Sequence, residues 1–521
     1  MRHSIPMRSG LMRPICVAIL SLLTLEFVHA QDPAQRVIVM FKPGSVAVGK
    51  AALQAAGAQI KHEIYGMDAV AIEVPARALA GLARNPNIEY VEPDEKRYAL
   101  ALDSPSTGSP YGLGQRVPYG ISMVQADQLA GANLSSRKLC IIDSGYDRSH
   151  EDLSSGPEVT GEYDRGTGWW YTDENHHGTH VAGTIAALNN AKGVVGVSAN
   201  ASLRLHIVKV FGASGWAYSS SLATAANKCK AAGANIISMS LGGSRMVKTE
   251  QRTFDSLYSG GILSFAAAGN DGTTALSYPA SYSSVVSVAA LDENRNWASF
   301  SQYNSQVEIA APGVGVLSTV PMGTGSNSAL TVGSRSYSPG GMDGSPKLTA
   351  SGALADFGLG GAVLAGSMNG RICLIQRGSY DFATKVSNCQ ASGGLGAVIY
   401  NNAAGGFGGT LGGVATSIPS VTASDAEGLA MKAQIGQIAT VAVTASNYAY
   451  YDGTSMATPH ASAVAALVWA LNPGCTAAQL RNSLNKSAED LGAPGRDTKF
   501  GFGLIRAKAA DTRIKTLGCG A

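Results

Sequence analysis

The sequence predicts an α/β protein whose parallel sheet is covered by helices on both faces, with a small α+β unit before it and a β-rich insert within it. The first observation is a set of apolar runs without polar alternation, as strands buried on both faces require. The second is that helical stretches lie between these runs. The third is that residues 322–447 interrupt this pattern with a Gly/Ala/Ser-rich segment.

Composition limits the classes of protein that fit. A length of 521 residues suggests about three domains at ~150 residues each. Lys and Arg total 39 against 36 Asp and Glu, which excludes a polybasic nucleic-acid binder and an acidic, solvating chain. Charged residues make up only 14%, and 63 residues are glycine, so we expect a compact chain rich in tight turns.

The N-terminus has the pattern of a secretory signal peptide over residues 1–30. Arg2, Arg8 and Arg13 precede an apolar run at 15–25, and Val-His-Ala at 28–30 supplies small residues at both cleavage-determining positions. About eleven apolar residues are too few to span ~30 Å of hydrocarbon, so a membrane anchor is not expected. We therefore expect a secreted protein.

The pattern of residues 31–100 predicts a ferredoxin-like unit with the element order βαββαβ. The expected strands are 37–41, 61–65, 69–74 and 88–91, and the expected helices are 47–56 and 76–84. A Ser/Pro/Gly-rich linker follows at residues 101–113.

The main α/β unit is expected in two parts, 114–321 and 448–521, on either side of the insert 322–447. Its expected strands are 138–142, 203–210, 235–239 and 262–267, and its expected helices are 181–188, 221–232 and 460–471. Within the insert we expect short strands at 371–376, 397–400 and 440–443.

Six cysteines remain once Cys16 leaves with the signal peptide, and an even number in an exported protein favours disulfides. Proximity along the chain favours Cys373–Cys389 and Cys475–Cys519, which leaves Cys140–Cys229. Two buried free thiols are the alternative for that last pair. None of the cysteines has the CxxC spacing of a zinc site.

Three short segments carry the residues of an activated hydroxyl nucleophile. Asp143 ends a buried strand, His177 begins a helix in His-Gly-Thr-His, and Ser455 follows Gly-Thr at another helix start. In such a group the His removes the Ser proton, and the Asp fixes the His tautomer. Taken singly, Ser455 would suit an N-cap, Asp143 would suit a turn, and His177 with His180 could hold a metal. His460 is expected to be a packed histidine.

The order Asp, His, Ser matches subtilisin and differs from the Ser, Asp, His order of α/β-hydrolase esterases. Through Ile142-Asp-Ser-Gly, His177-Gly-Thr-His-Val-Ala-Gly-Thr and Gly453-Thr-Ser-Met-Ala-Thr-Pro, the sequence resembles the subtilisin-like serine proteases (subtilases, peptidase S8 family) over about 111–321 and 448–510. The resemblance implies that Asp143 orients the base His177 and that Ser455 is the nucleophile. It also implies an oxyanion hole of Asn270 and the Ser455 backbone N–H, although Asn-Asp-Gly at 270–272 also suits a plain turn.

The resemblance implies a serine endopeptidase that forms an acyl-enzyme and is made as a self-processed zymogen. Residues 31–100 resemble the family's inhibitory propeptide, whose tail near 94–100 blocks the cleft, and 322–447 resemble a PA domain. Protein and peptide substrates would pair with exposed strand edges. The edge residues are Gly215, Trp216, Ala217, Ser240, Leu241 and Gly242. A catalytically inactive binding protein that uses its PA domain is the alternative. We expect a monomer that binds no nucleic acid.

A structural calcium ion is also implied by the resemblance. Leu-Asn-Asn-Ala-Lys-Gly-Val at 188–194 resembles the family's calcium loop, and calcium prefers six to eight oxygen ligands. The implied ligands are the side chains of Gln115, Asp152 and Asn190 and the backbone oxygens of Leu188, Lys192 and Val194. An ordinary Asn/Gly turn is the alternative.

Overall fold

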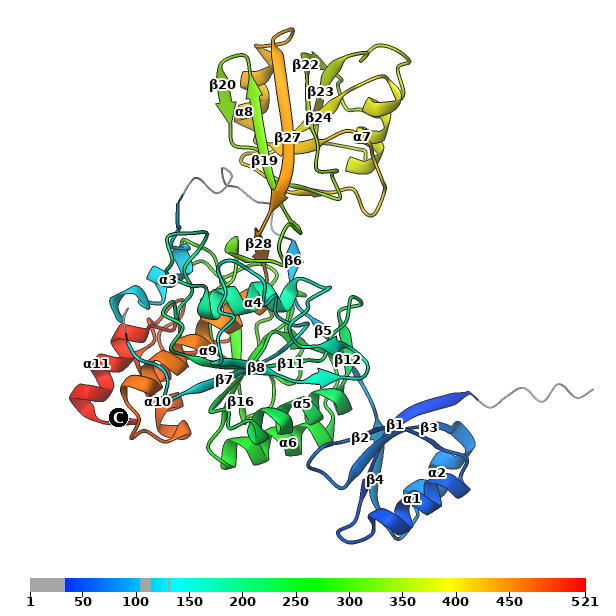
Figure 1. The fold of residues 1–521 in the computed structure, drawn as a ribbon, viewed down its shortest axis with the longest axis vertical. Coiled ribbons are helices and arrows are strands. Elements are labelled where there is room, and N and C mark those ends of the chain that lie inside the picture. The colour runs from blue at the N-terminus through cyan, green and yellow to red at the C-terminus, as the bar shows by residue number, and fades with distance from the viewer. Residues whose placement is uncertain (1–32, 104–113, 130–131) are drawn as a thin grey trace, which may run out of the picture.

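The computed structural model describes residues 33–103, 114–129 and 132–521, and Figure 1 shows that these form three units. The predicted signal peptide and residues 104–113 of the predicted linker lie outside the described residues. Within the described residues, no helix is long and apolar enough to cross a membrane.

The N-terminal unit is the predicted ferredoxin-like fold. Its elements are β1 (Ala34–Phe41), α1 (Val46–Ala55), β2 (Gln59–Glu63), β3 (Ala69–Pro75), a 3-10 turn (Ala76–Ala78), α2 (Leu79–Ala83) and β4 (Ile88–Pro93). The antiparallel sheet has the order β2-β3-β1-β4. Side chains of a strand alternate between faces. Accordingly Val39 and Phe41 pack on the helix side, while Ile38 and Met40 pack against Ala223 and Val247 of the main unit.

The main unit is built on a seven-stranded parallel sheet of order β17-β16-β15-β13-β7-β11-β8. Its strands are β7 (Lys138–Asp143), β8 (Val159–Gly161), β11 (Arg204–Lys209), β13 (Ile236–Met239), β15 (Leu263–Ala267), β16 (Val285–Leu291) and β17 (Val307–Pro312). Its helices are α3 (Tyr119–Met123), a 3-10 turn (Asp127–Leu129), α4 (His177–Ala186), α5 (Ser219–Ala231), α6 (Lys248–Ser259), α9 (Thr454–Leu471), α10 (Ala477–Ser487) and α11 (Ala507–Leu517).

Both faces of this sheet are covered, as the uninterrupted apolar runs predicted. In β7, Leu139 and Ile141 pack in the cluster that contains α9, whereas Cys140 and Ile142 pack in the cluster that contains α5 and α6. Figure 1 shows these helices on opposite sides of the strands. Helix α9 is buried along almost its whole length, which explains why its sequence is apolar on every side.

Short strands surround the main sheet. They are β5 (Lys96–Ala99), β6 (Leu102–Asp103), β9 (Tyr163–Asp164), β10 (Gly168–Trp169), β12 (Trp216–Tyr218), β14 (Leu241–Gly242), β18 (Val316–Thr319) and β28 (Tyr448–Asp452). Strand β6 lies within the predicted linker and pairs with β28, so the start of that segment is ordered by the main unit.

The insert has its own seven-stranded mixed sheet, of order β20-β19-β27-β22-β23-β24-β26. Its elements are β19 (Gly325–Val332), β20 (Arg335–Tyr337), β21 (Met342–Asp343), β22 (Thr349–Asp356), β23 (Arg371–Gln376), α7 (Phe382–Ala391), β24 (Gly396–Tyr400), β25 (Gly409–Thr410), β26 (Ser420–Ala423), α8 (Asp425–Lys432) and β27 (Ile438–Ser446). The chain leaves and re-enters the main unit along the antiparallel pair β19 and β27, as Figure 1 shows.

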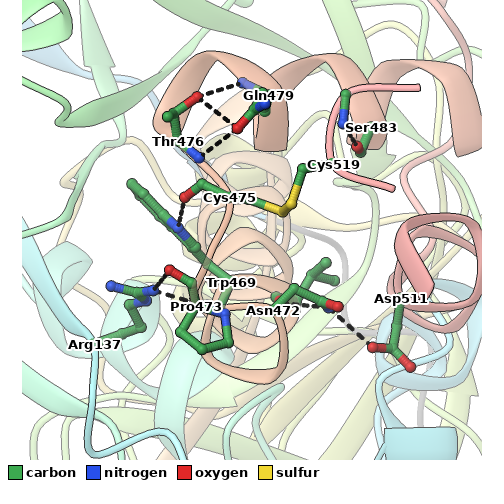
Figure 2. Close-up of a disulfide and its surroundings, with 12 residues drawn as sticks. Arg137, Trp469, Asn472, Pro473, Cys475, Thr476, Gln479, Ser483, Asp511 and Cys519 are labelled. Carbon is green, nitrogen blue, oxygen red and sulfur yellow. Dashed lines mark hydrogen bonds between the residues drawn. A yellow bond between two sulfur atoms is a disulfide. The ribbon is translucent and has the colours of Figure 1, made fainter. Parts of the chain in front are cut away.

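All three expected disulfides are formed. Cys140–Cys229 joins β7 to α5, and Cys373–Cys389 joins β23 to α7 inside the insert. Figure 2 shows the third, Cys475–Cys519, which ties the segment after α9 to the C-terminus. Beside it the Trp469 indole donates to the Cys475 carbonyl oxygen at 2.8 Å, so the end of α9 is held by both a covalent and a polar contact.

Candidate active site

The three predicted catalytic residues meet at the carboxyl edge of the parallel sheet. Asp143 is the last residue of β7, His177 is the first residue of α4, and Ser455 is the second residue of α9. All three side chains are buried in the described chain. Open α/β sheets place their sites at this edge because the strands end there and the following helices begin there.

The Asp–His pair is formed, while the serine hydroxyl points elsewhere. His177 Nδ1 lies 2.7 Å from Asp143 Oδ1, which also accepts from the Ser144 backbone N–H at 2.7 Å. Ser455 Oγ donates to the Ser240 carbonyl oxygen at 2.9 Å. Among the described residues His177 Nε2 has no hydrogen-bond partner, so the nitrogen that would take the serine proton is available.

The electrostatic surroundings favour a protonated His177. Burial alone would lower its pKa, but the charge and hydrogen bond of Asp143 and the charge of Asp173 outweigh burial and raise the pKa above its ordinary value. A carboxylate beside an imidazole stabilises the imidazolium that a general base becomes. The arrangement therefore suits proton removal from a hydroxyl.

Asn270 presents its amide N–H to a backbone carbonyl of the chain itself. Its Oδ1 accepts from the backbone N–H and the hydroxyl of Thr454, at 2.9 and 2.8 Å, which fixes the orientation of the amide. Its Nδ2 then donates to the Leu100 carbonyl oxygen at 2.7 Å. The sequence analysis missed Thr454, although its position directly before Ser455 at the start of α9 could have indicated this role.

A glycine makes room for that carbonyl. Gly453 has φ +147°, and a Cβ on it would lie 2.6 Å from the Leu100 carbonyl oxygen. Glycine avoids both the backbone strain and the collision. The N-terminus of α9, which is the positive end of the helix dipole, therefore lies close to the Leu100 carbonyl oxygen.

All six predicted substrate-edge residues lie beside residues 97–100, which belong to the chain's own predicted propeptide tail. Strand β5 lies between β12 and β14 and pairs antiparallel with both, with Tyr98 opposite Trp216 and Ala99 opposite Leu241. The Ala99 N–H donates to the Gly215 carbonyl at 3.0 Å, and the Leu100 N–H donates to the Ser240 carbonyl at 3.3 Å. The chain then continues into β6, which pairs with β28, the strand that precedes α9.

Carboxylates of the N-terminal unit cap two helices of the main unit. Asp94 accepts from the Ser220 N–H at 3.0 Å at the start of α5, and Glu92 accepts from the Lys248 and Thr249 N–H groups at 2.8 Å at the start of α6. Neither helix has a side-chain cap of its own at its N-cap residue. The docked unit therefore satisfies donors that these helices leave free.

Asp173 is a further residue that the sequence analysis missed. Its Oδ2 accepts from the Thr179 N–H at 2.8 Å in the first turn of α4, and its Oδ1 accepts from the Ser144 hydroxyl at 2.8 Å. The Ser144 hydroxyl in turn accepts from the Gly178 N–H at 2.8 Å. Asp173 thus fixes the start of α4, and with it His177, relative to the end of β7.

The other histidines near the site are packed. His180 Nε2 lies within hydrogen-bond distance of the Val316 and Ala449 carbonyl oxygens, and burial lowers its pKa to about 3. His460 Nδ1 lies 2.8 Å from the Met456 carbonyl oxygen, and burial lowers its pKa to about 4. The Nε2 atom of His180 is therefore engaged by two backbone carbonyl oxygens.

The residues predicted to hold calcium are gathered in one place. Gln115 Nε2 donates to the Leu188 carbonyl oxygen at 2.5 Å and to the Val194 carbonyl oxygen at 3.2 Å. Asp152 Oδ2 accepts from the Val194 N–H at 2.8 Å, and the buried carboxylate also has Tyr448 and Asn190 as hydrogen-bonding neighbours. Burial raises the pKa of Asp152 to about 7. A buried carboxylate beside the carbonyl oxygens of Leu188 and Val194 fits a hard cation, which prefers oxygen ligands.

Comparison with known families assigns each unit. The chain matches the Subtilase family over residues 135–345 and 396–503, the PA domain over 337–431, and the fervidolysin N-terminal prodomain over 34–94. The chain therefore belongs to the subtilase family, the S8 family of serine peptidases, with a prodomain and an inserted PA domain, as the resemblance implied.

Known proteins of this kind are similar over much of the chain. An alkaline protease of Alkalihalobacillus alcalophilus is 38% identical over 51% of this chain and 66% of its own length. Subtilisin DY of Bacillus licheniformis is 42% identical over 40% of this chain and 77% of its own length. The crystal structure of the psychrophilic subtilisin-like protease Apa1 from Pseudoalteromonas sp. AS-11 is 42% identical, with a TM-score of 0.62, and covers 78% of this chain and 100% of its own.

Proposed function

We propose that this subtilase is a secreted serine endopeptidase that is made as a zymogen and cuts its own chain between Leu100 and Ala101. The observation that carries the proposal is the Leu100 carbonyl oxygen, which accepts from Asn270 at 2.7 Å at the start of the helix that bears Ser455. This contact supports the proposal because the oxyanion donor expected for a substrate carbonyl here donates to a carbonyl of the chain itself.

The proposed reaction uses the named groups in sequence. Rotation of the Ser455 hydroxyl from Ser240 toward His177 Nε2 lets the imidazole take its proton as Oγ attacks the carbonyl carbon. The developing oxyanion accepts from Asn270 Nδ2 and from the Ser455 backbone N–H. The imidazolium, stabilised by Asp143, then protonates the leaving nitrogen, and water releases the acyl group by the reverse sequence.

The same contacts support the propeptide as an intramolecular inhibitor. After cleavage at residue 100, β5 would remain between β12 and β14, held by main-chain hydrogen bonds and by the two helix caps. Main-chain pairing of this kind implies that protein substrates of varied sequence can bind once the propeptide leaves. The function of the PA domain, the absence of nucleic-acid binding and the monomeric state stay predictions.

A structural calcium ion fits the loop at residues 188–194. The side chains of Gln115, Asp152 and Asn190 would hold it together with three backbone oxygens. Those backbone oxygens belong to Leu188, Lys192 and Val194. The ion would supply positive charge that neutralises Asp152 and ties the loop to the start of the main unit, with no part in the bond cleavage.

The Ser455→Ala variant tests the proposed function. It should be secreted as a folded chain that begins after the signal peptide, whereas the wild-type mature chain should begin at Ala101, as N-terminal sequencing and intact mass would report. Normal processing of purified Ser455→Ala without another protease would refute self-cleavage. A wild-type N-terminus elsewhere would refute the proposed bond.

A further inference from the structure

The fourth residue before the proposed cleavage bond is a buried arginine. Counting back from Leu100, this residue is Arg97, whose side chain is 1% exposed although it belongs to the propeptide tail. Its Nε donates to Glu250 Oε1 at 3.0 Å, and its Nη2 donates to Glu250 Oε2. Nη2 also donates to the Arg245 carbonyl at 3.0 Å, and Nη1 donates to the Lys96 carbonyl at 3.1 Å.

The acceptor for this arginine belongs to the main unit. Glu250 lies in the first turn of α6 and has no exposed side-chain surface. Besides Arg97, its carboxylate contacts the Tyr282 hydroxyl, which lies 2.9 Å from Oε2. Tyr282 itself belongs to the buried apolar cluster that also contains Leu241 and Phe254.

A glycine of the main unit completes the space for the guanidinium. A Cβ on Gly243 would lie 3.0 Å from Arg97 Nη1 and 2.6 Å from the Lys96 carbonyl oxygen. The pocket is thus shaped for an extended chain whose side chain at this position is long, planar and cationic.

The neighbouring positions of the tail offer less selection by side chain. The Tyr98 side chain is 47% exposed, and Ala99 is small and only partly buried. Lys96 of β5 places its Nζ 4.1 Å from the centroid of the Trp216 ring, whereas Arg97 is the position of β5 whose charge is paired with a buried carboxylate.

Departure of the propeptide would remove the positive charge that Arg97 brings to this pocket. Among the residues that the structure describes, Glu250 would then keep only the Tyr282 hydroxyl as a side-chain hydrogen-bond partner. The carboxylate would then have lost its counter-charge, and a ligand that brings a matching cation into the pocket restores the charge pair and its hydrogen bonds. Arginine meets both carboxylate oxygens with a rigid fork, whereas lysine offers a single point charge.

We infer that Glu250 selects substrates with arginine at the fourth residue before the cleaved bond, an inference that rests on the proposed function. Glu250 is then a specificity-determining residue of the mature enzyme, and Arg97 is the propeptide's own copy of the preferred substrate residue. The substrate class is a polypeptide with a basic residue four positions upstream of the cut.

Peptides based on residues 96–102 test this inference on wild-type mature enzyme. The quenched series Lys-X-Tyr-Ala-Leu-Ala-Leu carries arginine, lysine, citrulline or leucine at X. Citrulline keeps the shape of arginine and removes its charge. We expect kcat/KM for arginine to exceed that for citrulline and for leucine by about 30-fold or more, with lysine between them. Equal kcat/KM values for arginine and citrulline would overturn the inference.

Glu250→Gln identifies the residue responsible. It keeps the side chain's size, and it should reduce the arginine-to-citrulline ratio to near one. Asp255→Asn removes the same charge from the same helix and should keep the wild-type ratio. An unchanged arginine-to-citrulline ratio in Glu250→Gln would contradict the assignment of this residue. If that variant does not mature, the kcat/KM values of the wild-type enzyme for the peptide series decide whether arginine is selected. Failure to cleave any peptide or casein would instead refute the proposed function itself.

Discussion

Removal of the Asp94 carboxylate should loosen the propeptide from the main unit. In the uncleaved Ser455→Ala zymogen, Asp94→Ala removes the acceptor for the Ser220 N–H and hydroxyl at 3.0 and 2.7 Å and for the Ser219 hydroxyl at 3.1 Å. It also leaves Arg36 without the partner that lies 2.9 Å away. The Asp94 side chain has no exposed surface, so water does not replace these contacts while the units stay docked.

The expected loss can be worked from these contacts. Loss of an N-cap costs about 1 kcal/mol, and donors left unsatisfied in a buried place cost about 1–3 kcal/mol. Together they give about 2–4 kcal/mol, which corresponds to about a 30- to 1000-fold increase in the undocked population. Glu63→Ala removes a carboxylate of the same unit whose ion pair with Lys50 is exposed, so it should cost no more than about 1 kcal/mol.

Hydrogen exchange of the zymogens measures this change. Amides of β5 and of the first turn of α5 should exchange about 30- to 1000-fold faster in the Asp94→Ala zymogen, because both lose hydrogen-bond partners when the propeptide undocks. Glu63→Ala should leave the exchange of α5 near the parent level. An increase of less than about threefold at both segments in Asp94→Ala would refute the reasoning that this cap holds the propeptide.

The remaining predictions concern the catalytic groups and the calcium loop. Asn270→Leu should lower kcat by about 10²–10³ with little change in KM, the effect known for the equivalent donor in subtilisin; a change confined to KM would contradict the role. The pKa of His177 is raised, and a general base must be neutral to accept a proton. We therefore expect kcat/KM to fall as the pH drops through a value above the ordinary histidine pKa of ~6.5. An acid limb at or below about pH 6.5 would contradict this expectation. Chelation should lower the Tm of the mature enzyme, since an ion at 1000 times its Kd stabilises the fold by about 4 kcal/mol. Asp152→Ala should remove most of that response, and an identical Tm in chelator and in millimolar calcium would exclude a stabilising site.

The strand and the two helices that carry the predicted catalytic residues could be predicted from the sequence because their signals are local. Asp143 ends an apolar strand, His177 begins a helix, and Ser455 follows a glycine at a helix start. The two helices predicted at 181–188 and 460–471 were placed too late in the chain. Their first turns consist largely of polar motif residues, so the apolar pattern begins only after those turns. Helix α4 begins at His177 and α9 at Thr454.

Contacts between residues far apart in the chain could not be predicted in this way. Arg97 and Glu250 are each ordinary charged residues of a strand and a helix, and only folding brings them together across 153 positions. Asp173 likewise has no local pattern that distinguishes it from a turn residue. The mixed sheet of the insert was expected only in part, because its short Gly-rich strands carry a weak periodic signal.

Covalent labelling of the mature enzyme tests the central claim most directly. A serine-reactive fluorophosphonate should form one adduct, and peptide mass mapping should place it on Ser455. Casein hydrolysis should fall in proportion to the fraction labelled, because the hydroxyl activated by His177 is the nucleophile of the account. Full casein hydrolysis by completely labelled enzyme, or an adduct on a different residue that accounts for the loss of activity, would contradict the proposed active site.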